Sequence, residues 1–176
     1  MNKLKKQRCY LAGAIDRVPD RGYGWRESIT PFLEELKVEV FDPLVKPTDI
    51  AAEDESFAQI KQKLKMQEDY DGLARLMKKI RSVDLRMVDI SDFLIVNLDL
   101  DTHPCGTLEE IFWANRQKKP IIIHMVQGKI NAPDWLFGTI PHGMIFGSWN
   151  SLKQYLIKIN NNTITDPERW CFFNHG

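Results

Sequence analysis

The stretch FLIVNL, residues 93–98, is the most strand-like segment of this 176-residue chain. A second apolar run, PIIIHMV, follows at residues 120–126. The residues between them, 107–118, have the apolar spacing of an amphipathic helix. Two buried strands joined by a helix form a β-α-β unit, and its strands are parallel because the helix carries the chain back to the edge where it started.

The same alternation continues on both sides of this unit. Towards the N-terminus lie an apolar run at 9–15, a helical pattern at 25–37 and a short strand pattern at 38–41. Towards the C-terminus lies a strand pattern at 143–146, and Ser148 then caps a further helix. Right-handed crossovers between these strands predict an α/β fold with a doubly wound parallel sheet of about five strands and helices on both faces.

The rest of the chain is assigned to the same domain and its tail. Residues 47–82 are charged and polar, with apolar residues at helical spacing and a break near Asp71-Gly72. We interpret this stretch as one or two helices over a sheet edge, within one domain that spans residues 1–160. The tail, residues 161–176, contains WCFF at 170–173, which is too apolar to stay in solvent. We expect it to dock on the body of the domain or on a partner subunit.

Composition excludes several classes of function. The 24 Lys and Arg residues balance the 24 Asp and Glu residues, which removes the main ground for duplex nucleic acid or an anionic membrane as a partner. No apolar run approaches the roughly 18 residues of a membrane span. The distant cysteines Cys9, Cys105 and Cys171 form no CxxC pair, which favours reduced thiols in a cytoplasmic protein. Because no metal-ligand spacing is present, we expect neither a metal nor another cofactor.

The loop after residues 93–98 is the most suggestive part of the sequence. Ligands of parallel sheets bind beyond the carboxyl ends of the strands, and here Asp99 and His103 precede the segment GTLEE, residues 106–110. A carboxylate at such a place suits catalysis. The alternative is structural, since Thr107 and Glu110 match the Ser/Thr-x-x-Glu capping box, in which each side chain satisfies a backbone N–H at the helix start.

Short motifs in a fixed order lead to a resemblance. They are YLAG at 10–13, WR at 25–26, DP at 42–43, DL at 84–85 ahead of ISD at 90–92, and GTLEEIFWA at 106–114. Together they resemble the nucleoside 2-deoxyribosyltransferase family and its relatives that are deoxynucleoside monophosphate N-glycosidases. The match covers roughly residues 9–156. The resemblance implies a flavodoxin-like fold and an enzyme that cleaves the N-glycosidic bond of a 2-deoxynucleoside or its 5′-monophosphate.

By position, the resemblance implies catalytic roles for three residues. Glu110 matches the nucleophile that attacks C1′ of the sugar, Asp84 an aspartate that assists the departing base, and Tyr10 a tyrosine near the nucleophile. A carboxylate can capture the oxocarbenium-like carbon as an ester while a second acid supplies a proton to the base. The residues expected to bind substrate are Gly13, Asp16, Trp25, Arg26, Asp99, His103, Gly106, Thr107 and Met144.

One position departs from the family pattern. Pro104 stands where the transferases carry a further aspartate and the nucleotide-hydrolysing relatives a serine. The contact to the sugar hydroxyl is therefore left to Asp101, Thr102 or His103. The family also completes its pocket with residues of a neighbouring subunit, for which residues 142–144 are the candidate, and this favours a homo-oligomer.

The position of a 5′-phosphate is a separate question. The loop 13–24 leads from a strand to a helix N-terminus, where free N–H groups favour an anion, and Arg17, Arg21 and Arg26 lie in or just after it. The alternative is that these arginines are solvated charges and that Gly22 only permits a turn.

Three further residues have a plainer alternative. Asp84 also fits a helix-end charge paired to Arg81 or Arg86. Cys105 lies near a helix start, where a thiol becomes more reactive, but has no histidine partner except a near neighbour in the sequence. His124 falls inside a strand, as a satisfied core histidine does.

Three functions are consistent with the sequence. The first is cleavage of the N-glycosidic bond with transfer of the deoxyribosyl group to another base. The second is a deoxynucleotide N-hydrolase, in which water is the acceptor. The third is a non-catalytic module that binds or senses nucleotides, which Pro104 supports.

Overall fold

A five-stranded parallel sheet forms the centre of the molecule. The structure, a computed structural model, describes residues 2–16, 18–46, 55–163 and 169–170. Within those ranges the strands are β1 (Arg8–Gly13), β2 (Glu39–Phe41), β3 (Phe93–Leu98), β4 (Ile121–Met125) and β5 (Ile145–Phe146). Their order across the sheet is β2-β1-β3-β4-β5, and every neighbouring pair is parallel. The prediction of an α/β fold with a doubly wound sheet is confirmed.

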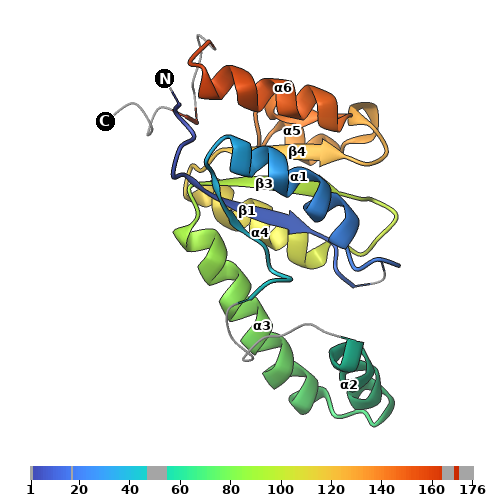
Figure 1. The fold of residues 1–176 in the computed structure, drawn as a ribbon. Helices are drawn as coiled ribbons and strands as arrows, with labels where there is room; N and C mark the ends of the chain where they lie inside the picture. Colours follow the sequence, from blue (N-terminus) through green and yellow to red (C-terminus); the bar gives the residue numbers. More distant parts are fainter. Residues whose placement is uncertain (1, 17, 47–54, 164–168, 171–176) are drawn as a thin grey trace.

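Helices cover both faces of this sheet. They are α1 (Tyr23–Glu35), α2 (Glu55–Met66), α3 (Tyr70–Ile90), α4 (Cys105–Arg116), α5 (Asp134–Phe137) and α6 (Trp149–Asn160), with the short 3-10 helices η2 (Lys129–Asn131) and η3 (His142–Met144). Helices α1 and α6 lie on one face, and α3 and α4 lie on the other (Figure 1). No helix of the described residues is long and apolar enough to cross a bilayer.

The strand order fixes where a ligand site can form. Strand β2 is added on one side of β1, and the chain then crosses back to add β3 on the other side. The direction in which strands are added therefore reverses between β1 and β3. The register pairs Gly13 with Asn97, which brings the carboxyl ends of β1 and β3 level. A crevice forms at such a reversal because the loops after the two strands turn to opposite faces.

The helical excursion differs from the prediction in its boundaries. Helix α2 ends at Met66 and α3 runs from Tyr70 to Ile90, so the break precedes the predicted Asp71-Gly72. The Asp69 side chain accepts a hydrogen bond from the Gly72 N–H at 2.8 Å, which caps α3 and places the glycine in the first helical turn. The first part of the predicted stretch, residues 47–54, lies outside the described residues. The lower half of α3 projects from the body with α2 beside it (Figure 1).

Two described residues of the tail contact the body of the domain. The Trp170 ring is 1% exposed, lies 5.4 Å from the Phe93 ring between centroids, and donates its Nε1–H to the Tyr155 hydroxyl at 2.9 Å. Arg169 donates to the backbone oxygens of Thr139 at 2.8 Å and Lys119 at 3.2 Å. The remaining apolar residues of the tail, 171–173, lie outside the described residues.

Candidate active site

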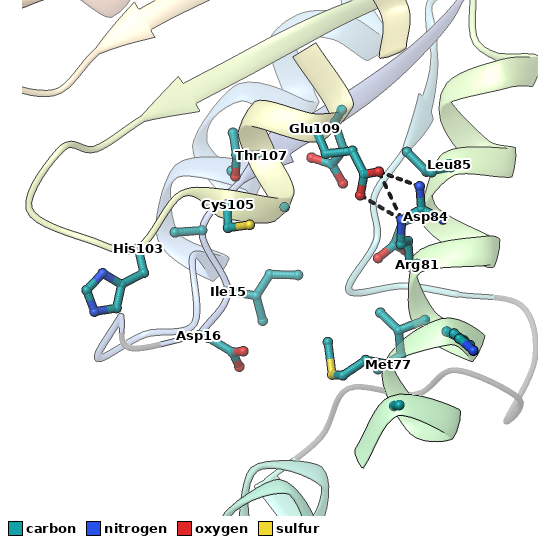
Figure 2. A pocket seen from close by; sticks show the side chains of 17 residues that line it. Ile15, Asp16, Met77, Arg81, Asp84, Leu85, His103, Cys105, Thr107 and Glu109 are labelled. Carbon is teal, nitrogen blue, oxygen red and sulfur yellow. Dashed lines mark hydrogen bonds and ion pairs between the residues drawn. The ribbon is translucent and has the colours of Figure 1, made fainter. Parts of the chain in front are cut away.

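A cavity of about 550 Å³ lies at the carboxyl end of β1, between the start of α4 and the middle of α3 (Figure 2). This volume is within the range of small-molecule sites. Its walls come from three segments that are far apart in the sequence: residues 13–16 after β1, residues 74–85 of α3, and residues 103–110 around the start of α4. The crevice predicted by the strand order therefore exists.

Tyr10 and Glu110 meet at the inner wall of this cavity. Tyr10 is fully buried in β1 and donates its hydroxyl to Glu110 Oε1 at 2.6 Å. Burial raises the pKa of Tyr10 well above its usual value, and the negative charges of Glu110 and Asp84 raise it further. The hydroxyl therefore stays protonated and can only donate to the carboxylate.

The start of α4 determines where Glu110 points. The helix begins at Cys105 with Pro104 as its N-cap residue, and no described side chain caps it. Thr107 therefore lies in the first turn, buried, and Glu110 follows one turn later on the same face. The capping-box alternative for Thr107 and Glu110 is wrong, because the helix starts two residues before Thr107 and the Glu110 carboxylate binds Tyr10 instead.

Asp84 lines the cavity from α3 and forms an ion pair with a residue that the sequence analysis missed. Lys46 Nζ lies 2.8 Å from Asp84 Oδ1, and the side chains of Lys46 and Asp84 are 2% and 14% exposed. The alternative partner Arg81 instead pairs with Glu109. Nothing in the sequence identifies Lys46, because it lies in the irregular segment after β2 where neither periodicity nor a motif assigns it a face.

A second ion pair stands at the rim of the cavity. Arg81 Nε of α3 donates to both carboxylate oxygens of Glu109 of α4, at 2.8 and 2.9 Å (Figure 2). The Glu109 carboxylate raises the pKa of Arg81, and Arg81 in turn lowers the pKa of Glu109. Arg81 and Asp84 are three residues apart on α3, the spacing that puts two side chains on one helix face, so the position of Arg81 at the cavity could have been anticipated from Asp84. Its pairing with Glu109 could not.

The structure brings some of the predicted binding residues to the cavity. Gly13, Asp16, His103, Gly106 and Thr107 line it. The Asp16 carboxylate is held at the mouth by Lys61 of α2, whose Nζ lies 2.6 Å from Asp16 Oδ2. Cys105 also lines the cavity and is exposed, a position consistent with a wall residue.

The other predicted binding residues lie elsewhere in the described structure. Asp99 accepts a hydrogen bond from the Gln127 amide at 2.6 Å in the loop after β3. Met144 is buried in the core of its own chain within η3. The Trp25 ring stacks on Trp149, with centroids 5.7 Å apart, on the opposite face of the sheet. These residues do not line the cavity.

Arg26 is a buried residue near the start of α1 that binds the loop before the helix and does not line the cavity. Its guanidinium donates to the backbone oxygens of Gly22 at 3.0 Å and Gly13 at 3.1 Å, and its Nε lies 3.4 Å from Asp42 Oδ1. Gly22 has a φ of +75°, and a Cβ there would approach Arg26 Nη1 to 2.4 Å. Gly22 and Arg26 therefore fix the turn into α1.

The same turn argues against the predicted phosphate site. The Asp20 carboxylate accepts hydrogen bonds from the backbone N–H groups of Gly22 and Gly24, both at 2.9 Å. These contacts hold the pKa of Asp20 below its ordinary value. The N–H groups that would bind an anion at the start of α1 are thus already used by the protein's own carboxylate. Arg17, the first arginine of this loop, lies outside the described residues.

His124 lies in β4, where its ring is partly buried. His124 Nδ1 lies 2.7 Å from Asn97 Oδ1, and its ring stacks on Trp149 at 4.3 Å between centroids. Burial lowers the pKa of His124, which favours the neutral ring. Among the residues that the structure describes, no group of three or more His, Cys, Asp or Glu side chains is arranged to hold a metal ion.

Comparison with known proteins adds a likeness of fold. The chain matches no family model and no curated protein. A 2-deoxyribosyltransferase from Bacillus psychrosaccharolyticus is 14% identical, with a TM-score of 0.55, and the alignment covers 84% of this chain and 91% of that protein. A 2-deoxyribosyltransferase from Leishmania mexicana is 16% identical, with a TM-score of 0.54 and coverage of 86% and 97%. A CMP N-glycosidase from Clostridium botulinum, BcmB, is 20% identical, with a TM-score of 0.47 and coverage of 88% and 99%. The chain therefore has the α/β fold of the 2-deoxyribosyltransferases, the family that its motifs resemble.

Proposed function

We propose that this protein cleaves the N-glycosidic bond of a 2-deoxynucleoside or its 5′-monophosphate and transfers the deoxyribosyl group to another base. The observation that carries the proposal is the 2.6 Å hydrogen bond from Tyr10 to Glu110 at the wall of a 550 Å³ cavity that Asp84 also lines. The ordered sequence motifs and the shared fold support it.

Glu110 is the nucleophile in this proposal. The Tyr10 hydroxyl binds Oε1 and orients the carboxylate for attack on the anomeric carbon. As the bond from C1′ to the base nitrogen breaks, the sugar gains oxocarbenium character, and Glu110 captures it as a covalent ester. An incoming base then attacks the same carbon and releases Glu110. Two displacements at one carbon retain its configuration.

The cavity offers suitable surroundings for both halves of a nucleoside. Apolar side chains of α3, among them Met77, Ile80 and Leu85, form a wall against which a flat heterocycle can pack. At the start of α4, Gly106 and Thr107 line the part of the cavity nearest the helix N-terminus, where backbone N–H groups favour oxygen atoms of a sugar or phosphate. In this proposal the base lies along α3 and the sugar lies between Glu110 and the start of α4.

Hydrolysis, with water as the acceptor, is the second candidate function. The transferases of the resembling family carry an aspartate where this chain has Pro104, whose ring offers no oxygen to a sugar hydroxyl. A pocket that holds the deoxyribosyl ester less completely admits water in place of the second base.

The test is a panel of 2′-deoxynucleosides and their 5′-monophosphates, each incubated with and without a second free base. Transfer gives a new nucleoside, hydrolysis gives free base with free sugar, and a binding module gives neither. Glu110→Gln, which preserves the shape of the side chain, should reduce base release by at least about 10³-fold, because the amide cannot form the ester.

A trapping experiment identifies the nucleophile directly. A 2-deoxy-2-fluoro nucleoside slows breakdown of the ester, and peptide mapping by mass spectrometry should then find the sugar on Glu110. Glu34→Gln, an exposed carboxylate of α1 on the other face of the sheet, is the matched control and should retain parental turnover. Normal turnover by Glu110→Gln, or a sugar attached elsewhere, would show that the assignment is wrong.

A further inference from the structure

Lys46 forms an ion pair with Asp84, the cavity residue expected to assist the departing base of the substrate. It lies in the segment that follows β2, and its side chain is 2% exposed. Its Nζ approaches Asp84 Oδ1 to 2.8 Å, while Asp84 itself lines the cavity and Lys46 does not. The Asp84 carboxylate therefore separates a buried ammonium group from the position proposed for the departing base.

This arrangement changes the role open to Asp84. A neighbouring ammonium group favours the ionised form of a carboxyl. An ionised carboxylate accepts hydrogen bonds and has no proton to give. A base that departs with the electron pair of the glycosidic bond needs a proton, so Asp84 alone does not meet that need, and the nearest proton that the pair holds is on Lys46.

Three other ionisable groups at the cavity, Tyr10, Arg81 and Asp16, are already held by partners. The Tyr10 hydroxyl points to Glu110, and burial together with the nearby negative charges holds its proton. Arg81 is paired with Glu109 and does not release a proton at any working pH. Asp16 is paired with Lys61, and the remaining charged or ionisable residues that line the cavity are Lys78, His103 and Cys105.

We propose that Lys46 and Asp84 act as one proton-carrying pair, in which Lys46 supplies the proton that Asp84 passes to the departing base. The inference rests on the proposed function. As the C1′–N bond breaks, its electron pair leaves with the base, and a Glu110 oxygen forms the ester bond to C1′. Lys46 transfers its proton to the Asp84 carboxylate and becomes a neutral amine, and the carboxyl group formed in this way passes the proton to the base. When a second base or water attacks C1′, its proton returns through Asp84 to Lys46 and Glu110 leaves as a carboxylate.

A buried lysine suits this role better than an arginine would. Burial disfavours the charged form of an amine, so release of the proton removes the cost of keeping an ammonium group out of water. The negative charge of the Asp84 carboxylate favours the return of the proton to Lys46 after each cycle. A guanidinium pairs with a carboxylate at least as well but keeps its protons. Lys46 touches Asp84 rather than the substrate, and is therefore a positioning residue that also holds a proton.

The difference between the two cations gives the experiment. Lys46→Arg preserves the charge and removes the releasable proton, and Lys46→Met removes both. Each variant is assayed on the best deoxynucleoside of the panel and on an activated substrate, either 7-methyl-2′-deoxyguanosine or 4-nitrophenyl 2-deoxyriboside, whose leaving groups depart without a proton. The ratio of kcat on the ordinary substrate to kcat on the activated one should fall about 10²-fold or more in Lys46→Arg.

A matched control and a measurement on the parent protein complete the design. Lys119→Arg changes another partly buried lysine, which donates to backbone oxygens of residues 88 and 89 at the amino end of the sheet, and should leave the ratio at its parental value. In the parent protein, kcat on the ordinary substrate should fall as the pH rises, because the pair loses its proton. That decline should be absent on the activated substrate, and this measurement requires no variant to fold.

The outcomes separate this inference from the function on which it rests. A parental ratio in Lys46→Arg would overturn it, since charge alone would then suffice, as would an equal loss on both substrates. A fall of the ratio in His103→Gln, with Lys46→Arg unchanged, would assign the proton to His103. Failure of the parent protein to release any base, or turnover that survives Glu110→Gln, would instead contradict the proposed function.

Discussion

The Tyr10 hydroxyl contributes to the site through a single contact. It donates to Glu110 Oε1 at 2.6 Å from a fully buried position in β1, and its raised pKa keeps it a donor well above neutral pH. A hydrogen bond to a charged group contributes about 1.5–3 kcal/mol. If that bond orients Glu110 for attack, its loss should slow the first displacement without disturbing the packing of the ring.

Tyr10→Phe tests this role. It keeps the buried ring and removes only the donor, so kcat should fall by about 10–100-fold and the free energy of unfolding by about 1.5–3 kcal/mol. Steady-state assays and urea unfolding measure the two quantities. Tyr155→Phe is the control, because that hydroxyl accepts from Trp170 on the other face of the sheet and its removal should change stability and not kcat. An equal kcat in Tyr10→Phe and the parent protein would show that the reaction does not depend on the hydrogen bond from Tyr10 to Glu110.

Single residues were predictable to the extent that a motif fixed them. Glu110, Asp84 and Tyr10 were identified because they belong to motifs of a resembling family, and the roles inferred for them stay predictions. Arg26 and Trp25 belong to a motif of the same kind, yet they lie outside the cavity. The sequence alone does not distinguish a motif that stabilises the turn into α1 from one that binds a ligand. Lys46 has no motif, and only the fold brings it to Asp84.

At the scale of elements, the predicted boundaries outside residues 47–82 lie within two residues of those observed. The errors have local causes. Helix α4 begins at Cys105, with Pro104 at the N-cap position, whereas the predicted helical pattern began at residue 107. The apolar run at 9–15 extends two residues beyond β1, which ends at Gly13. Ala14 and Ile15 belong to the following loop, and Ile15 is apolar where it lines the cavity.

The start of α1 depends on Asp20, whose carboxylate caps the N–H groups of Gly22 and Gly24. Those hydrogen bonds lower the pKa of Asp20. A carboxyl whose pKa is lower in the folded state stabilises the fold above its unfolded pKa, and this contribution is lost as the pH falls through the folded value. Asp20→Ala should therefore cost about 0.5–1 kcal/mol near pH 7, at the low end for a cap because the side chain is exposed.

Urea unfolding at a series of pH values measures this contribution. The difference between Asp20→Ala and the parent should be constant near neutral pH and shrink in acid, once Asp20 is protonated in both states. Glu27→Ala removes another exposed carboxylate of α1 and should change stability by less than about 0.5 kcal/mol at any of these values. A difference for Asp20→Ala that grew in acid would contradict the capping role.

For the whole molecule, the sheet was predictable because its central strands are buried on both faces. Residues 93–98 and 120–126 are apolar without alternation, a pattern typical of parallel strands between helix layers, and the structure places them at the centre. The position of the cavity followed from the reversal of strand order. Its shape did not, because the wall contributed by α3 depends on where a long helix packs against α4, which local patterns do not encode.

Trp170 joins the end of the chain to this body, and its loss should destabilise the whole domain. Truncation of a buried tryptophan costs about 3–5 kcal/mol, or about 6–20 °C in Tm for a protein of this size. Trp170→Ala should show this loss in thermal unfolding, and Trp170→Phe, which gives up the bond to Tyr155 but fills part of the site with a smaller aromatic ring, should lose less than Trp170→Ala. Trp135→Ala, at a position 78% exposed, should change stability by less than about 0.5 kcal/mol.

Trp170 packs on Phe93, the first residue of β3, and so lies at the opposite end of the sheet from the cavity. At temperatures below the unfolding transition, the kcat of Trp170→Ala should therefore equal that of the parent protein. A proportional loss of kcat would mean that the tail acts on the site and not only on the stability of the fold.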